Sequence, residues 1–151
     1  MGCDAVVVDI LRKSFPALDF QECEQLSSYL ELQEFAKDTI LMTQGDAGDF
    51  MGFVLCGKLA IKKETTFPGK FVLIAILEEG AMVGEVAMAE ETIRTASVMA
   101  MEDSSVLVLS NENAEMLFQE NPLVAVKMLK RIVKVVGGRL QLASARLAQL
   151  L

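Results

Sequence analysis

A short stretch in the middle of the chain holds side chains that could bind a small anion. Gly84 precedes a predicted short helix, Glu85 lies in its first turn, and Arg94 begins the next predicted strand nine residues later. Glycine allows a ligand to approach the backbone closely. Free amides at a helix N-terminus, here those of Val86 and Ala87, attract negative charge. The residue types therefore predict an anion site.

The two charged residues of this stretch narrow the kind of anion. The guanidinium of Arg94 has a fork geometry that matches two phosphate oxygens. The carboxylate of Glu85 is an acceptor that suits a ribose hydroxyl. A cyclic phosphodiester beside a free 2′-hydroxyl satisfies both groups and the helix amides at once. The same pair is also compatible with a solvated surface ion pair, which would contribute little.

The sequence contains no histidine, which excludes several classes of site. Ser–His catalysis, histidine-ligated metals and the metal-dependent cupins, which share a related barrel shape, all require that side chain. The cysteines Cys3, Cys23 and Cys56 have no metal-ligand spacing and are expected to be reduced thiols. We therefore expect no enzyme, no metal and no cofactor.

The charge and the hydropathy of the chain limit the kinds of partner that it can bind. The 151 residues carry a net charge of −7, with no stripe of basic residues, so direct binding of DNA or RNA is not expected. The longest apolar run, residues 71–77, is far shorter than the roughly 20 residues that span a bilayer. Asp4 and Asp9 interrupt any N-terminal signal peptide. The sequence therefore predicts a cytoplasmic protein with no membrane partner.

The elements that must position the site follow from the hydrophobic periodicity. Helical spacing predicts helices over residues 4–13 and about 20–31. Residues 34–110 change to short apolar runs with turn signals roughly 8–12 residues apart, which indicates a barrel or jelly roll. One short helix near residues 85–90 interrupts these strands. With 52% hydrophobic residues and no linker, the whole chain 1–151 is expected to form one domain.

The C-terminal region returns to helical periodicity. A helix is predicted from Ser110 or Asn111 toward Gln119, and Asn121 with Pro122 begins a last helix toward residue 151. Its apolar residues alternate in steps of three and four, as in a coiled-coil seam. The seam consists of Val126, Leu129, Val133, Val136, Leu140, Ala143, Leu147 and Leu150.

We predict that this seam forms a homodimer. The alternative is that the helix packs only on its own β-roll. Gly137 and Gly138 interrupt the helix, where each glycine costs about 1 kcal/mol relative to alanine. The sequence leaves open whether this pair is a hinge, a close helix crossing or a fray point without a role.

Two motifs resemble the cyclic-nucleotide-binding family, which includes catabolite activator protein and the regulatory subunits of protein kinase A. Residues 83–87 read Val-Gly-Glu-Val-Ala and residues 94–98 read Arg-Thr-Ala-Ser-Val, similar to the family's phosphate-binding cassette. Residues 45–61 resemble its Gly-Asp-x-Gly-Asp turn and the strands that follow. The resemblance implies an eight-stranded β-roll (a jelly roll or double-stranded β-helix), flanked by N-terminal helices and a long C-terminal helix.

The resemblance also implies roles by position. Arg94 would bind the exocyclic phosphate oxygens, and Glu85 would hold the 2′-hydroxyl. The other implied ligand-binding residues are Gly84, Val86, Ala87 and Ala96 through their backbone, Ile61, Ile74 and Ala75 in the base pocket, and Thr95 and Ser144 near the base. Val83 and Ile93 replace a usual aromatic and a usual proline, and neither change removes a ligand group.

The choice between cAMP and cGMP depends on two further parts of the sequence. Thr95 is found after the arginine in cGMP-binding members and also in cAMP-responsive channels, whereas residues 139–144 are similar to the segment of catabolite activator protein that meets adenine. We therefore favour cAMP over cGMP as the ligand of a regulatory sensor. The alternative is a structural dimerisation domain of the same fold that binds no ligand.

Overall fold

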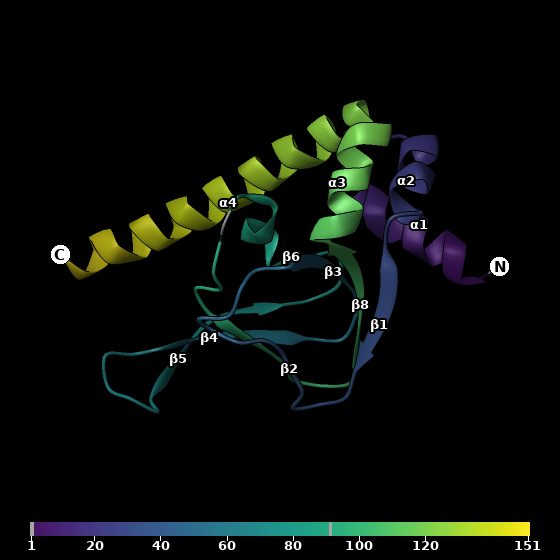
Figure 1. Cartoon of the computed structure of the whole chain (residues 1–151). Coiled ribbons are helices and arrows are strands. Elements are labelled where there is room, and N and C mark those ends of the chain that lie inside the picture. The colour runs from purple at the N-terminus through teal and green to yellow at the C-terminus, as the bar shows by residue number, and fades with distance from the viewer. Residues whose placement is uncertain (1, 91) are drawn as a thin grey trace.

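The computed structural model describes residues 2–90 and 92–151, with side chains from residue 6 onward. Two N-terminal helices precede a roll of strands, and two helices follow it (Figure 1). The helices are α1 (Gly2–Ser14), α2 (Phe20–Ser27), the 3₁₀ helix η1 (Glu85–Met88), α3 (Asn111–Glu120) and α4 (Pro122–Leu150). The strands are β1 (Glu31–Phe35), β2 (Ile40–Met42), β3 (Phe50–Cys56), β4 (Leu59–Glu64), β5 (Phe71–Leu77), β6 (Met82–Val83), β7 (Ser97–Ala100) and β8 (Ser104–Ser110).

The strands form two antiparallel four-stranded sheets, in the orders β1-β8-β3-β6 and β2-β7-β4-β5. This arrangement confirms the predicted roll of eight strands, counted over the described residues. One boundary prediction was wrong, because the second helix ends at Ser27 and not near residue 31. Glu31–Phe35 instead pairs with β8 from Val108 to Ser104, a contact between segments more than 60 residues apart that local periodicity cannot reveal.

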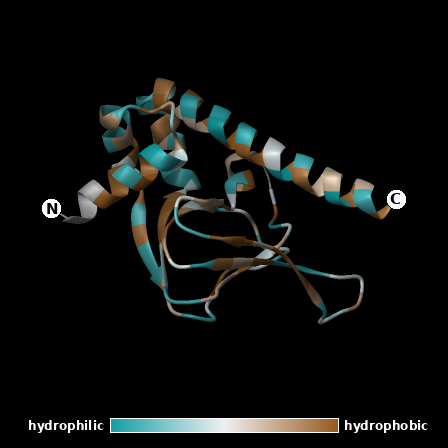
Figure 2. Ribbon diagram, turned by 180° about the vertical axis from the view of Figure 1, so that it is seen from behind, coloured by the Kyte–Doolittle hydropathy of each residue, from teal (hydrophilic) through white to brown (hydrophobic). Residues whose placement is uncertain are grey.

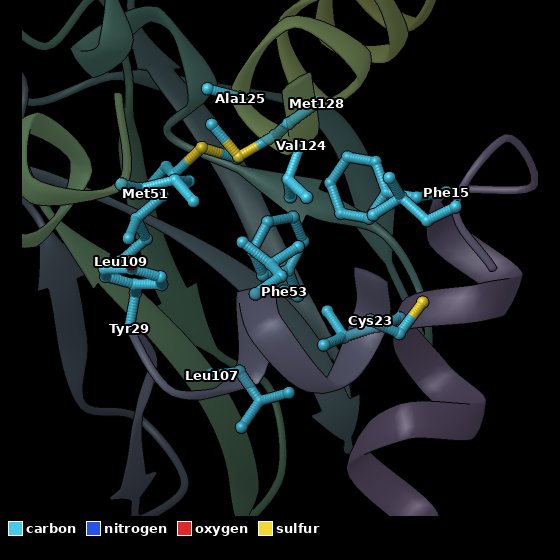
Figure 3. Packing of buried hydrophobic residues seen from close by; sticks show 14 of the residues in the cluster. Phe15, Cys23, Tyr29, Met51, Phe53, Leu107, Leu109, Val124, Ala125 and Met128 are labelled. Atoms are coloured by element: carbon cyan, nitrogen blue, oxygen red, sulfur yellow. The ribbon is translucent and has the colours of Figure 1, made fainter. Parts of the chain in front are cut away.

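The larger hydrophobic core joins the helices to the first sheet. Phe15 of α1 packs edge-on against Phe53 of β3, with ring centroids 5.3 Å apart and an interplanar angle of 72°. Val124 and Met128 of α4 belong to the same buried cluster as these two rings (Figure 3). The proximal part of α4 is therefore fixed to the roll by buried apolar contacts.

The distal part of α4 extends past the roll to the C-terminus (Figure 1). The buried residues of this helix are Val124, Ala125, Met128 and Ile132, and every residue from 140 to 150 is exposed. Most of the predicted seam is exposed too, including Val133 at 71% and Leu140 at 66%, whereas Leu129 is partly buried against the core. A single chain thus leaves most of the seam uncovered, contrary to the alternative in which it packs only on its own roll.

Strand β5 is the outer strand of the second sheet. It is hydrophobic along most of its length (Figure 2), yet five of its seven residues are exposed: Phe71, Val72, Leu73, Ile74 and Ile76.

None of the helices in the part of the chain that the structure describes has both the length and the hydropathy needed to span a bilayer.

Candidate functional site

The stretch predicted to bind an anion lines a small cavity between the roll and α4. The cavity has a volume of about 110 Å³, and the elements that reach it are far apart in the sequence. Its lining includes Gly48, Ile61, Gly84, Glu85, Arg94 and Arg139. The fold therefore brings the predicted anion-binding residues together and adds a side chain from the C-terminal helix.

Gly84 begins the 3₁₀ helix with a left-handed backbone, at φ +69°. A Cβ at this position would lie 2.6 Å from Nη1 of Arg94 and 2.6 Å from Cε of Met42. Both the conformation and the space therefore require glycine here. The backbone lies directly against the guanidinium as a result.

The amides after Gly84 differ from the prediction. The segment is a single 3₁₀ turn and not a longer helix, and the amide of Ala87 donates to the Gly84 carbonyl at 3.1 Å. The prediction that the Ala87 amide is free was therefore wrong, because the i→i+3 bond of the turn uses it. The Val86 amide makes no hydrogen bond within the described residues and stays available to an anion.

Arg94 is buried, with 8% of its surface exposed. Its Nη2 donates to the Phe50 carbonyl at 2.6 Å, and its Nη1 donates to the Gly84 carbonyl at 3.2 Å. The guanidinium also lies over the Phe50 ring, 4.9 Å from the centroid. Since a guanidinium has five N–H donors, these two bonds fix its orientation and leave further donors for a ligand.

The electrostatics of Arg94 reflect this burial. Burial lowers the pKa of Arg94, and the nearby carboxylates of Asp49 and Glu85 act in the opposite direction. The Asp49 carboxylate lies 3.8 Å from Nη2 and is largely exposed. The side chain remains a cation at neutral pH, because an arginine does not lose its proton in proteins. The cavity thus contains a fixed positive charge inside an acidic protein.

Glu85 pairs with a residue of α4 and not with Arg94. Its Oε1 accepts a hydrogen bond from Nη1 of Arg139 at 2.6 Å, and Nη2 of the same arginine donates to the Met82 carbonyl at 2.7 Å. The Glu85 side chain is only 9% exposed. The alternative of a solvated surface pair between Glu85 and Arg94 is therefore wrong.

Sequence reasoning did not assign Arg139 to the site, although a signal was present. A carboxylate that enters a cavity needs a cationic partner, because an unpaired buried charge is costly. Only two basic residues, Arg139 and Arg146, lie in the last twelve residues of α4. Thr92 was missed as well: it lines the cavity, and its buried Oγ1 has no hydrogen-bond partner within the described residues.

Eight of the eleven predicted ligand-binding residues line this cavity. They are Ile61, Gly84, Glu85, Val86, Ala87, Arg94, Thr95 and Ala96. Ile74 and Ala75 lie on β5, which is irregular at this point because its pairing with β4 shifts register. Ser144 is exposed on the distal part of α4, beyond Arg139. The structure does not bring these three residues to the cavity, and their roles stay predictions.

The chain is similar to proteins of known family. The model of the cyclic nucleotide-binding domain matches residues 32–121. The chain is 31% identical to the cyclic AMP receptor protein of Thermus thermophilus over 111 residues, which cover 74% of this chain and 51% of that protein. The lysophospholipase nte1 of Aspergillus oryzae is 28% identical over 105 residues, 70% of this chain and 7% of that protein. The chain thus spans about half the length of the first relative and a small part of the second.

Solved structures give the same result. A cyclic nucleotide-binding domain from Methylobacillus flagellatus superposes with a TM-score of 0.88 at 25% identity, covering 99% of this chain and 85% of that one. The catabolite activator protein of Thermus thermophilus superposes with a TM-score of 0.79 at 28% identity, covering 91% of this chain and 62% of that one. With the family model matching more than half of its residues, the chain belongs to the cyclic nucleotide-binding domain family.

Proposed function

We propose that the chain is a regulatory sensor that binds cAMP, in preference to cGMP, in the cavity of Arg94 and Glu85. The observation that carries this proposal is the buried guanidinium of Arg94, which two backbone carbonyls hold at the cavity with donors to spare. A preorganised cation with a fork of donors suits the two exocyclic oxygens of a cyclic phosphate. The free Val86 amide beside it suits the same group.

The ribose end of the ligand would meet Glu85. Arg139 holds Oε1 of this carboxylate, and Oε2 makes no hydrogen bond within the described residues. Oε2 can therefore accept a bond from a 2′-hydroxyl while Arg139 fixes the orientation of the carboxylate. Because Arg139 belongs to α4, the ligand would contact a group that is bonded directly to the C-terminal helix. Coupling between ligand and helix of about 1–3 kcal/mol is typical of such linked sites.

The preference for cAMP is supported by the similarity to a cyclic AMP receptor protein, at 31% identity. Thr95 lines the cavity and could serve either base. The alternative of a dimerisation domain without a ligand is less favourable. Such a domain would have no reason to keep a buried cation and a buried carboxylate at one small cavity, where both cost desolvation free energy.

The exposed seam of α4 supports a homodimer as the active form. Val133, Leu140 and Leu147 are each more than half exposed in one chain, and their spacing matches a second copy of the same helix. We expect the dimer to act in the cytoplasm, without catalysis and without direct contact to nucleic acid. Its signal would pass to a partner protein, which experiment has to identify.

Titration calorimetry with cAMP and with cGMP tests the binding proposal. We expect micromolar or tighter binding of cAMP and weaker binding of cGMP. Arg94→Ala should weaken the affinity by roughly 100-fold, because a charge-assisted bidentate contact is lost. Arg94→Lys keeps the charge but loses the fork, and should give an intermediate loss if Arg94→Ala fails to fold.

The matched control is Arg146→Ala, which removes an exposed arginine of α4 away from the cavity. This variant should bind as the parent does. A parent that binds neither nucleotide would overturn the sensor proposal. An Arg94→Ala variant with unchanged affinity would overturn the site.

A further inference from the structure

We infer that the hairpin of β4 and β5, residues 59–77, is a docking surface for a membrane that contains anionic lipids. The contact is limited to the headgroup layer. It requires no nucleotide, so it does not rest on the proposed function. The sequence predicts no membrane partner because it has no spanning segment and no signal peptide, and a surface contact needs neither.

The first observation is an apolar surface that the roll leaves uncovered. The hairpin extends beyond the other strands (Figures 1 and 2), and four of its large apolar residues are at least half exposed: Phe67, Phe71, Val72 and Leu73. Val72 and Leu73 are successive residues of a strand, so their side chains point to opposite faces. A folded partner that packs on one face would leave the other face bare, whereas a fluid headgroup layer surrounds a projecting hairpin on both.

The second observation is the charge of the hairpin. Its three lysines and one glutamate give a net charge of +2, while the chain as a whole carries −7. The charged residues are Lys62, Lys63, Glu64 and Lys70. The rest of the chain therefore carries −9. An anionic leaflet attracts the hairpin and repels the net charge of the remainder, which fixes the orientation of the contact.

The third observation is that hydrogen bonds order the loop of the hairpin. The Thr65 amide donates to the Lys70 carbonyl at 2.7 Å, and the Gly69 amide donates to Oε1 of Glu64 at 2.9 Å. The one carboxylate of the hairpin is thus held by the loop. Nζ of Lys70 lies 5.7 Å from the centroid of the Phe67 ring. The loop therefore presents an aromatic ring and an ammonium group together, a pair that suits the boundary between acyl chains and lipid phosphates.

The open edge of the sheet limits the depth of this contact. Strand β5 is the outer strand, so the backbone groups along one of its sides have no partner in the sheet and must stay hydrated. The headgroup layer supplies water and polar groups, whereas the hydrocarbon core supplies neither. We therefore expect Phe67, in the loop, to reach deepest.

Co-sedimentation of the full chain with lipid vesicles, in the absence of nucleotide, tests the inference. We expect binding to phosphatidylcholine vesicles that contain about 30% phosphatidylserine. Binding should be at least tenfold weaker to phosphatidylcholine alone, and should fall at least tenfold when the salt concentration rises from about 0.1 M to about 0.5 M. No binding to the anionic vesicles would overturn the inference.

Two matched pairs of variants locate the contact. Phe71→Ala should weaken vesicle binding at least fivefold, whereas Phe20→Ala on α2 should leave it unchanged, although the two residues are 54% and 55% exposed. Lys63→Glu should weaken binding roughly tenfold. Lys134→Glu makes the same change of charge at an exposed position of the basic helix α4, and should leave binding within about twofold of the parent. Equal binding by the two members of either pair would place the contact elsewhere and overturn the inference.

The chain contains no tryptophan, which allows a direct measurement of depth. The fluorescence of a Phe67→Trp variant should shift to the blue when anionic vesicles are added. Lipids brominated near the headgroup should quench it more than lipids brominated near the ends of the acyl chains. A Phe20→Trp variant should not respond to vesicles. If the Phe67→Trp emission shifts with protein concentration alone, the hairpin is a contact between copies of the chain, and the membrane inference is wrong.

Discussion

Arg94 shows how the fold prepares a charge for a ligand. The side chain has lost most of its water, and the Phe50 carbonyl, the Gly84 carbonyl and the Phe50 ring replace part of that hydration. A group held in this way does not have to be reorganised when an anion arrives. The free energy that would otherwise order a flexible arginine is therefore available for affinity.

Replacing Gly84 by alanine should test two features of this glycine: its left-handed backbone and its close approach to the Arg94 guanidinium. The left-handed backbone at φ +69° should cost about 1–2 kcal/mol of stability with any Cβ. The added Cβ should also displace the ends of the Arg94 and Met42 side chains, and the shift of Arg94 should weaken the hydrogen bond that holds it to the Gly84 carbonyl. We therefore expect cAMP affinity to fall at least tenfold, measured by calorimetry.

Gly45→Ala is the matched control for that change. Gly45 has a similar left-handed backbone, at φ +93°, but a Cβ there would meet nothing within 4 Å. Urea denaturation should show a comparable loss of stability for both variants, with unchanged affinity for Gly45→Ala alone. Equal affinities in the two variants would show that the close approach at Gly84 has no role in binding.

At the scale of elements, α4 links the core, the cavity and the proposed dimer. Lys127 forms two hydrogen bonds with the carboxylate of Glu22 at 2.9 and 2.8 Å, which ties α4 to α2. Together with the Arg131 bond to α1, this fixes the proximal turns on the N-terminal helices. The direction in which the distal turns leave the roll is therefore set by contacts remote from the cavity.

A charge in the seam should prevent the proposed dimer. Val133→Asp introduces a carboxylate at a position that is 71% exposed in one chain and would be buried between two helices. Sedimentation velocity should show a dimer for the parent and a monomer for this variant. Leu142→Asp, on the same helix outside the seam and 54% exposed, should stay dimeric. A monomeric parent at high concentration would contradict the prediction.

The elements also show what the sequence could predict. The start of α4 at Pro122, the strand region and the presence of Gly84, Glu85 and Arg94 at one cavity follow local patterns, and the structure agrees with them. Arg94 was predicted to begin a strand, which was wrong, because β7 begins only at Ser97 and Arg94 lies in the segment before it. Strand β1 and the role of Arg139 did not follow, because each depends on a partner more than 50 residues away. The amide of Ala87 was predicted wrongly for a local reason, since a 3₁₀ turn uses a donor that an α-helix would leave free.

For the whole molecule, the lack of histidine predicts an unusual pH profile of stability. No side chain with an ordinary pKa titrates between pH 5 and 8 when histidine is absent. The free energy of unfolding should therefore stay within about 0.5 kcal/mol between pH 6 and 8. Urea titrations across this range check the plateau, and a change of about 1 kcal/mol or more would contradict it.

Above the plateau, Cys23 should contribute to a decline. Burial raises the pKa of Cys23 above its ordinary value of 9.0, while Arg12 acts against that rise. The folded protein therefore holds the thiol proton more tightly than the unfolded chain does. Stability is retained below pH 9 and falls as the pH rises past it. In Cys23→Ala this part of the alkaline decline should be absent from the same titrations.

The strand order has a consequence for how the chain is made. Strand β8 lies between β1 and β3, so the first sheet cannot assemble until residue 110 has left the ribosome. The apolar faces of α1 and β3 stay bare still longer, until Val124, Met128 and Ile132 of α4 arrive to cover them. Since contacts between distant segments form slowly, the nascent chain exposes this surface to chaperones and to neighbouring chains until at least residue 132 has emerged.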